Sequence, residues 1–389
     1  MVAGHLQEKK NLYYIVLDFQ DEKGKRRQKW LPTGLPIKGN KKKAEAMLAD
    51  ARVNFAPPTT EPREGETLFS DYLIDWLEIA KPTIAQTTYA SYRQMTKGVI
   101  VPYFEERNIT LTGIKPQDIQ AFYTEQLKRV KASSVIHYHA VIHRALKYAV
   151  KIDVLVANPA DKVERPRKEP FKASFYDSTE MEQLFEASRG TYLEIPILLG
   201  AFYGLRRSEV VGLRWEAVDF KRNTLTISHT VTSYTLDGKR HTIAQDTTKT
   251  KSSMRTLPLV PAIRGKLLAV KEQQRVYIDL CGKSYDKQYI GYICVNPMGG
   301  LITPNYITQT FPELLAKNNL RRIRFHDLRH SCASLLLANG VPMKQIQEWL
   351  GHSDFSTTAN IYAHLDYNSK IDSAQAMELG LSAALSGVM

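Results

Sequence analysis

The chain has 389 residues, of which 43% are hydrophobic, and its Lys and Arg residues outnumber Asp and Glu by 13. This length is too great for one ordinary core and predicts two or three domains. The excess positive charge makes a polyanion such as nucleic acid the first partner to consider. Three cysteines without a CxxC pair argue against a disulfide scaffold or a structural zinc site. A polar N-terminus and the lack of a membrane-length apolar run favour a cytoplasmic protein with no membrane association.

The first predicted domain, residues 1–56, is a small β-sheet followed by a helix. Apolar and polar residues alternate over 12–19, a polar turn covers 21–25, a further short strand covers 29–34, and helical spacing covers 41–54. The domain holds 12 Lys and Arg residues against 6 Asp and Glu residues. Such a charge run fits a solvated hairpin rim as well as DNA binding. The candidate DNA contacts are Lys25, Arg26, Arg27 and Lys29.

A Pro-rich stretch at 57–65 predicts a linker, and residues 66–158 then have a helical pattern throughout, which predicts an all-α bundle of four or five helices. Two apolar stripes mark helix faces: Phe69, Tyr72, Leu73, Trp76 and Leu77, and Ile136, Ala140, Ile142, Leu146 and Val150. The second linker is predicted at 162–170, where charged residues are interrupted by two prolines.

The last helix of this bundle and the loop before it are rich in cations. The candidate DNA contacts here are Lys128, Arg129, Lys131, His139, His143, Arg144 and Lys147. Together with His137, the two histidines also allow a metal site, but no Cys or carboxylate completes it at ligand spacing. Exposed polar side chains or phosphate contacts are therefore favoured.

Residues 172–389 are predicted to form a third, mixed α+β and mostly helical domain. Helices are expected at 179–188, 193–203 and 208–213, strands at 224–229 and 255–258, and helix over most of the chain after 303.

Two motifs in this domain present cations at the ends of elements. In YGLRRSEVVGLRW, a glycine turn ends one helix and Ser208 is a plausible cap for the next, so Arg206 lies at a helix junction near Glu209. A guanidinium held there can bind two phosphate oxygens, although an Arg–Glu pair that merely closes a helix end is the simpler alternative. In TKTKSSMRTLPL, Lys249 precedes a strand and could donate a proton to a departing alkoxide, or be an ordinary surface lysine.

Two further motifs follow in the helical part. In FHDLRHS, His326 and Arg329 are spaced to share a helix face, which suits a phosphate but also suits a buried His beside an ion-paired Arg. In WLGHSDFSTTANIYAH, Gly351 ends a helix, His352 follows in the turn, and Tyr362 falls near the second turn of the next helix. Alone, Tyr362 would be read as a partly buried aromatic residue.

Taken together, the two arginines, one lysine, two histidines and one tyrosine of these motifs are the residue types that phosphoryl transfer without a metal ion needs. The transition state spreads negative charge over the phosphate oxygens, which Arg206 and Arg329 could stabilise. The aspartate cluster that Mg²⁺ would require is not evident in the sequence, so no metal or nucleotide cofactor is expected. Tyr362 would supply an oxygen nucleophile that keeps the bond energy in a phosphotyrosine ester.

The strings GLRRSE, TKTKSSMR, HDLRH and LGHSDFSTTANIY, in this order, resemble the signature of the tyrosine recombinases of the phage integrase family. The resemblance implies a site-specific DNA recombinase in which Arg206 and Arg329 bind the scissile phosphate and Lys249 is the general acid. It further implies that His326 assists proton transfer, His352 hydrogen-bonds the phosphate and Tyr362 is the nucleophile. Glu209 matches a supporting acidic position.

The same resemblance implies the domain roles, most closely those of integrases of Gram-positive conjugative transposons. Residues 1–56 resemble an arm-binding domain, residues 66–158 a helical core-binding domain, and residues 172–389 the catalytic domain. A tail helix at 370–386 would dock onto a neighbouring protomer in a homotetramer on double-stranded DNA, or pack on its own domain. Excision or DNA-bending proteins are possible accessory partners, and a nucleoid-associated place in a bacterial cytoplasm is expected.

Two other functions remain open from the sequence. A type IB topoisomerase-like nicking and resealing enzyme uses a similar residue set, although the arm domain and the tail argue against it. A DNA-binding regulator that has lost the chemistry is disfavoured because all six expected catalytic residues are present.

Overall fold

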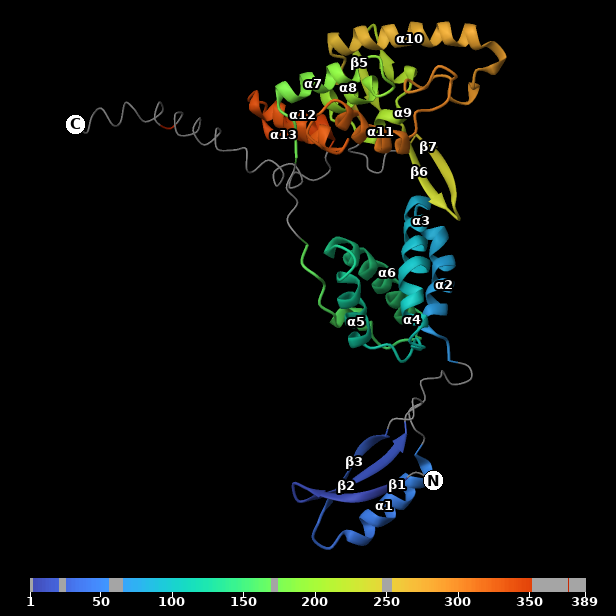
Figure 1. The fold of residues 1–389 in the computed structure, drawn as a ribbon, viewed down its shortest axis with the longest axis vertical. Helices are drawn as coiled ribbons and strands as arrows, with labels where there is room; N and C mark the ends of the chain where they lie inside the picture. The colour runs from blue at the N-terminus through green and yellow to red at the C-terminus, as the bar shows by residue number, and fades with distance from the viewer. Residues whose placement is uncertain are drawn as a thin grey trace, which may run out of the picture. The chain divides into compact units, whose positions relative to one another are not determined.

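The computed structural model describes residues 3–20, 26–55, 66–168, 174–246 and 254–351, together with Met377. The chain divides into two compact units, Met1–Glu169 and Pro170–Met389. Figure 1 colours the elements in chain order from the N-terminus to the C-terminus. The predicted linker at 57–65, the predicted tail helix at 370–386 apart from Met377, and Lys25, Lys249, His352 and Tyr362 lie outside the described residues. Among the described residues, no helix is long and apolar enough to cross a membrane.

The N-terminal part is a small antiparallel sheet followed by one helix, as predicted, but the sheet has a third strand. Strands β1 (Ala3–Lys9), β2 (Leu12–Gln20) and β3 (Arg26–Pro36) pair in the order β1-β2-β3, and helix α1 (Lys41–Asn54) follows. Strand β1 was not expected, because its polar side chains are mostly exposed and give no clear alternation. A two-residue turn, in which Lys10 and Asn11 both have positive φ, joins it to β2, a geometry that suits tight hairpins.

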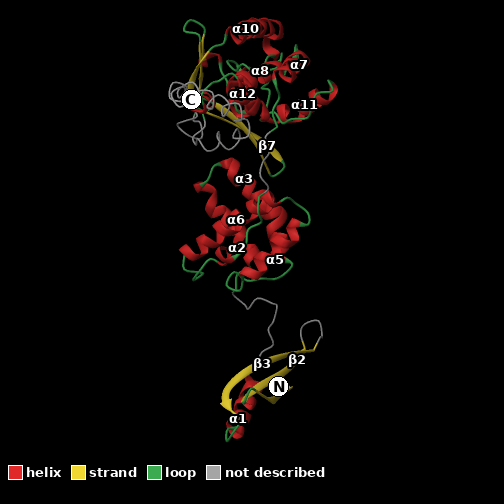
Figure 2. Ribbon diagram, turned by 90° about the vertical axis from the view of Figure 1, so that its left-hand side faces the viewer, coloured by secondary structure: helices red, strands yellow, loops and turns green. Residues whose placement is uncertain are grey.

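Residues 66–168 contain five α-helices, in agreement with the predicted bundle (Figure 2). They are α2 (Phe69–Ala80), α3 (Gln86–Met95), α4 (Val101–Glu105), α5 (Pro116–Leu127) and α6 (Ala132–Lys151), with short helical turns at Lys81–Thr83, Thr96–Ile100 and Pro159–Lys162. The predicted apolar stripe of α2 is buried along its whole length.

The predicted stripe of α6 is partly wrong. Ile142 and Leu146 are buried, but Ala140 is exposed. The buried face consists of Val135, Tyr138, Val141, Ile142, Ala145, Leu146 and Ala149. Helix α2 contacts this face, where the Tyr72 hydroxyl donates a hydrogen bond of 2.7 Å to the Ala145 carbonyl. The face of α6 that packs in the bundle is therefore rotated from the face that the predicted apolar stripe defined.

The C-terminal unit combines helices with small antiparallel sheets, as predicted. Its helices are α7 (Ser178–Ser188), α8 (Glu194–Tyr203), α9 (Arg207–Gly212), α10 (Pro261–Cys281), α11 (Pro304–Lys317), α12 (Asp327–Ala338) and α13 (Met343–Leu350). Strands β4 (Val218–Asp219), β5 (Thr224–Ile227) and β8 (Arg255–Pro258) form one sheet, and β6 (Thr230–Leu236) pairs with β7 (Lys239–Gln245) in another. The core lies between α8, α12 and α11 and the sheet residues Leu225, Ile227 and Leu257.

Hairpin β6–β7, the short strand β4 and helix α10 were not predicted. Hairpin β6–β7 extends from the body of the unit (Figure 1), and its strands are rich in Thr and polar residues that give little apolar alternation. The Asp237-Gly238 turn was the signal that could have revealed it. Helix α10 was missed because it buries only Ile263 and Leu267. Its apolar periodicity is correspondingly weak.

Candidate active site

Arg206 lies between two helices, as the sequence predicts. Helix α8 ends at Tyr203, and the next residue, Gly204, has a left-handed φ of 59°. A Cβ on Gly204 would lie 2.3 Å from a Leu350 methyl carbon. Only glycine fits this position without strain. The expectation that Ser208 caps the next helix is wrong: α9 begins at Arg207, and extended Arg206 is its N-cap. The Glu209 carboxylate accepts the Arg206 backbone N–H at 3.0 Å, as the acidic N3 residue of a capping box does.

Glu209 is a buried carboxylate that binds two arginines. Its side chain is 2% exposed; Oε1 accepts a hydrogen bond from Arg206 Nη1 at 2.7 Å, and Oε2 accepts one from Arg255 Nη2 at 3.0 Å. Burial alone would raise the pKa of Glu209, but the positive charges of Arg255 and Arg206 lower it below its usual range. The carboxylate is therefore ionised and fixes both guanidinium groups.

Arg329 is a buried cation on α12. It is 2% exposed, and its Nη1 and Nη2 donate to the carbonyls of Gly204 at 2.6 Å and Leu350 at 2.7 Å. Burial, followed by the nearby charge of Arg206, lowers the pKa of Arg329 to about 9. The side chain still carries its charge at neutral pH. The two carbonyl bonds orient the guanidinium plane.

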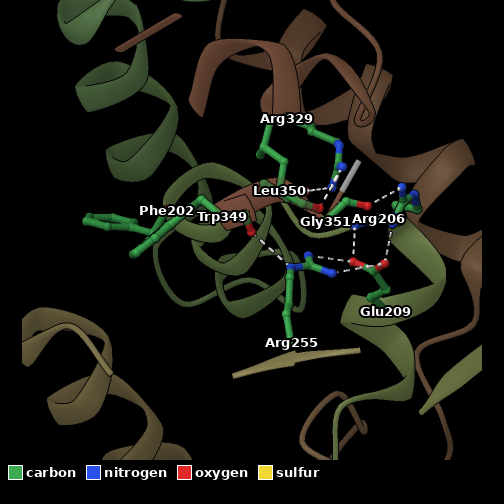
Figure 3. Close-up of polar contacts among 9 residues, drawn as sticks. Phe202, Arg206, Glu209, Arg255, Arg329, Trp349, Leu350 and Gly351 are labelled. Carbon is green, nitrogen blue, oxygen red and sulfur yellow. Dashed lines mark hydrogen bonds and ion pairs between the residues drawn. The ribbon is translucent and has the colours of Figure 1, made fainter. Parts of the chain in front are cut away.

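Three arginines converge on the C-terminal end of α13 (Figure 3). Arg255 Nε donates to the Trp349 carbonyl at 2.9 Å, Arg329 to that of Leu350, and Arg206 Nη2 to that of Gly351 at 3.3 Å. A helix end leaves such carbonyls without partners and carries partial negative charge, so cations are stabilising there. We call Arg206, Glu209, Arg255 and Arg329 the arginine cluster. It holds the backbone directly before His352.

His326 is next to this cluster in sequence and immediately precedes α12. Its backbone is already in the right-handed helical region, so it and Arg329 follow one helical path, as predicted. Part of the side chain stays exposed. Partial burial of the ring, together with His330, Arg329 and Arg324, lowers the pKa of His326 to about 4. In the free protein the imidazole is therefore neutral at pH 7 and can accept a proton.

Sequence reasoning missed Arg255. It belongs to the string TKTKSSMR, but an arginine in a short strand is normally read as an exposed residue. Its side chain is only 6% exposed. The signal that could have revealed it is the alternation of side chains along β8. Arg255 lies two residues before the buried Leu257, so both side chains point to the same side of the strand.

The candidate DNA contacts of the N-terminal unit divide into two kinds. Arg26, Arg27, Lys29, Lys128, Arg129, Lys131, Arg144 and Lys147 are exposed. His139 and His143 instead have partners within the unit: His139 Nδ1 lies 2.8 Å from the Tyr123 hydroxyl, and His143 Nε2 lies 2.7 Å from Asp161 Oδ1. Within the described ranges, no group of three or more His, Cys, Asp and Glu residues is arranged to hold a metal ion.

Comparison with known proteins places these features in a family. Residues 174–369 match the model of the phage integrase family, and residues 68–127 match that of the phage integrase N-terminal SAM-like domain. A tyrosine recombinase XerC-like protein of Caldanaerobacter subterraneus subsp. tengcongensis is 26% identical over 325 residues, covering 80% of this chain and 83% of the relative. Tyrosine recombinase XerD of Lacticaseibacillus casei is 25% identical over 307 residues, covering 77% of this chain and 94% of that relative.

Solved structures show the same fold. The Tn1549 transposon integrase, in complex with a circular intermediate DNA, superposes with a TM-score of 0.65 at 17% identity, covering 80% of this chain and 99% of that one. A lambda integrase tetramer bound to a Holliday junction gives a TM-score of 0.60 at 16% identity, covering 92% of this chain and 94% of the lambda integrase chain.

The chain belongs to the phage integrase family. It is a tyrosine site-specific recombinase, an enzyme that exchanges DNA strands by transesterification.

Proposed function

We propose that the chain cleaves and rejoins double-stranded DNA with Tyr362 as nucleophile, and that Arg206 and Arg329 of the arginine cluster bind the scissile phosphate. The observation that carries this proposal is the convergence of Arg206 and Arg329 on consecutive carbonyls at the end of α13. His352 and Tyr362 follow this helix end in the chain. Cations whose positions the fold fixes can stabilise the negative charge that develops on the phosphate oxygens.

The reaction is a balanced exchange of two ester bonds. The Tyr362 oxygen forms a bond to phosphorus as the bond from phosphorus to the 5′ oxygen breaks, which leaves a 3′-phosphotyrosine and a free 5′ hydroxyl. Lys249 donates the proton that the leaving oxygen takes up. His326, neutral in the free protein, assists proton transfer, and His352 hydrogen-bonds a phosphate oxygen. A 5′ hydroxyl from the partner duplex reverses the step and completes strand exchange.

The domain roles are part of the same proposal. Residues 1–56 bind arm sites, residues 66–158 bind core sites, and residues 172–389 carry the chemistry. A homotetramer joined by exchange of the tail at 370–386 exchanges one pair of strands at a time through a Holliday junction, and so integrates and excises a mobile element. The lambda integrase and Tn1549 integrase complexes with DNA support this assembly by likeness of fold. Accessory excision or DNA-bending proteins would act with it, at the nucleoid in a bacterial cytoplasm.

A nicked suicide substrate tests the proposed nucleophile. Cleavage beside a nick releases a short strand, so the covalent protein–DNA adduct accumulates and survives denaturant. We expect an adduct with the parent chain and none with Tyr362→Phe, whose ring lacks the attacking oxygen. Peptide mapping of the adduct should place the DNA on Tyr362. An adduct that persists with Tyr362→Phe would assign the nucleophile elsewhere.

The same substrate separates the two alternative functions. A DNA-binding regulator without chemistry would bind the site and form no adduct. A type IB topoisomerase-like enzyme would form the adduct and relax supercoiled DNA but would not exchange strands between two paired sites. We expect both an adduct and exchanged strands.

A further inference from the structure

Arg255 directs its guanidinium group into the protein. Its Nε donates to the Trp349 carbonyl at 2.9 Å, and its Nη1 and Nη2 lie 3.5 Å and 3.0 Å from the two carboxylate oxygens of Glu209 (Figure 3). Its side chain is only 6% exposed. The group is thus committed to protein partners and hidden from a phosphate that approaches from solvent. Any influence of Arg255 on such a phosphate passes through its neighbours.

Arg206 binds the same carboxylate but is partly exposed to solvent. Its side chain is 34% exposed, against 6% for Arg255, and its Nη1 donates to Glu209 Oε1 at 2.7 Å. An arginine and a single carboxylate would form a neutral pair, in which the carboxylate repels any phosphate that the guanidinium binds. Glu209 therefore orients Arg206 but, by itself, weakens the attraction of Arg206 for phosphate.

Arg255 supplies the second positive charge that this carboxylate contacts. Two guanidinium charges against one carboxylate charge leave one net positive charge on Arg206, Glu209 and Arg255 together. Burial raises the pKa of Glu209, and the charge of Arg255 is the strongest influence that lowers it, ahead of the charge of Arg206. The buried arginine therefore balances most of the negative charge of Glu209. Because the Glu209 side chain is 2% exposed, dissolved ions screen these charges little.

We infer that Arg255 is a positioning residue: it takes up the negative charge of Glu209 and so leaves the positive charge of Arg206 to the scissile phosphate. This inference rests on the proposed role of Arg206. The bond to the Trp349 carbonyl offers a purely structural alternative, in which Arg255 only holds strand β8 against the end of α13. The two roles differ in one respect. If Arg255 acts by charge, its loss is most harmful while Glu209 is ionised.

Single-turnover cleavage of the nicked suicide substrate by the full-length chain tests this dependence. We expect Arg255→Met to slow cleavage by about a hundredfold, near the lower end of what one oriented donor to a developing anion contributes. Adding Glu209→Gln to Arg255→Met should speed cleavage by about tenfold, because it removes the negative charge that is no longer balanced. In the parent chain Glu209→Gln should instead slow cleavage by about tenfold, because Arg206 loses its orientation. The effect of Glu209→Gln thus changes sign.

Two further variants separate charge from packing. Arg255→Lys keeps a positive charge near Glu209, so adding Glu209→Gln to it should slow cleavage, as in the parent. Arg255→Gln is neutral but still donates hydrogen bonds, and it replaces Arg255→Met, with the same expected order of rates, if circular dichroism shows that the methionine variant does not fold. The matched control is Arg275→Met, because Arg275 pairs with Glu272 on α10 through side chains that are 72% and 60% exposed. It should cleave within about twofold of the parent.

The outcomes separate this inference from the proposed function. Suppose that the double variant is as slow as Arg255→Met or slower, or that Arg255→Met cleaves like the parent, while Arg206→Gln abolishes cleavage. The charge-balancing role of Arg255 is then wrong, and the phosphate-binding role of Arg206 stands. If Arg206→Gln itself cleaves like the parent, the proposed role of Arg206 fails, and the inference about Arg255 fails with it.

Discussion

The arginine cluster and the basic strand β3 use the same side chain in opposite ways. In the cluster, the guanidinium groups of Arg255 and Arg329 are nearly inaccessible, and carbonyls and one carboxylate fix their directions. On β3, Arg26, Arg27 and Lys29 are exposed to solvent. A buried cation acts through its exact geometry, whereas an exposed cation acts mainly through its charge. Substitutions that keep the charge should therefore distinguish the two regions.

The largest effect is expected for Arg329→Lys. Lysine keeps the charge but cannot donate in two fixed directions to the carbonyls of Gly204 and Leu350. We expect single-turnover cleavage to fall by about 10²–10³, the usual loss of one oriented donor to a developing anion. The matched control is Arg321→Lys, because Arg321 pairs with Glu180 on the surface of the same unit. A rate for Arg329→Lys within about threefold of the parent would contradict a geometric role.

A smaller effect is expected for Glu209→Gln, which leaves Arg206 and Arg255 without their shared charge partner. Removing one member of a buried ion pair costs about 3 kcal/mol of unfolding free energy. We expect cleavage to fall by about tenfold as well. Chemical denaturation of Glu209→Gln, Arg255→Met and the double variant measures their coupling. Additive losses would mean that the two side chains do not act as one unit.

Acid should weaken the catalytic unit through three histidines whose pKa the fold lowers. Burial lowers the pKa of His229 and His330, and that of His326 to about 4. In the unfolded chain histidine titrates near 6.5. Their stabilising contribution is therefore complete above about pH 6.5 and is lost as the pH falls toward 4.

Thermal unfolding at pH 7.5 and pH 5 measures this effect. We expect the midpoint to fall by several degrees in the parent and by less in His326→Gln, which has no proton to take up. His241→Gln, on the exposed strand β7, is the control and should behave like the parent. An equal fall in His326→Gln would remove His326 from the explanation.

The smallest effect on chemistry is expected on β3. Replacing Arg26, Arg27 and Lys29 by Gln should leave cleavage of an isolated core site unchanged. Binding to arm sites should lose part of its salt dependence, by about 0.9 in slope for each phosphate contact removed. Titrations at several salt concentrations measure this slope. If these substitutions abolished cleavage of the isolated core site, the division between arm binding and chemistry would be contradicted. Loss of core-site cleavage after deletion of residues 1–56 would contradict it in the same way.

Local patterns in the sequence predicted the parts of the fold that depend on neighbouring residues. The glycine turn before Arg206, Glu209 three residues later, and the helix after His326 all follow from short-range spacing. Arg255 was missed because its carbonyl acceptor, Trp349, lies 94 positions later. The hydrogen bond between Arg214 and the Tyr292 hydroxyl was missed for the same reason, since these residues are 78 positions apart. Contacts at such separations leave no periodic trace in the sequence.

The most direct test of the arginine cluster uses a substrate whose scissile phosphate is replaced by an uncharged methylphosphonate. If Arg206 and Arg329 act by meeting the charge of that phosphate, removing the charge should make them less necessary. We predict that the loss caused by Arg329→Lys shrinks from about 10²–10³ on the phosphodiester to a few fold on the methylphosphonate. The same loss on both substrates would contradict the account, because it would show that Arg329 supports the fold without acting on the phosphate.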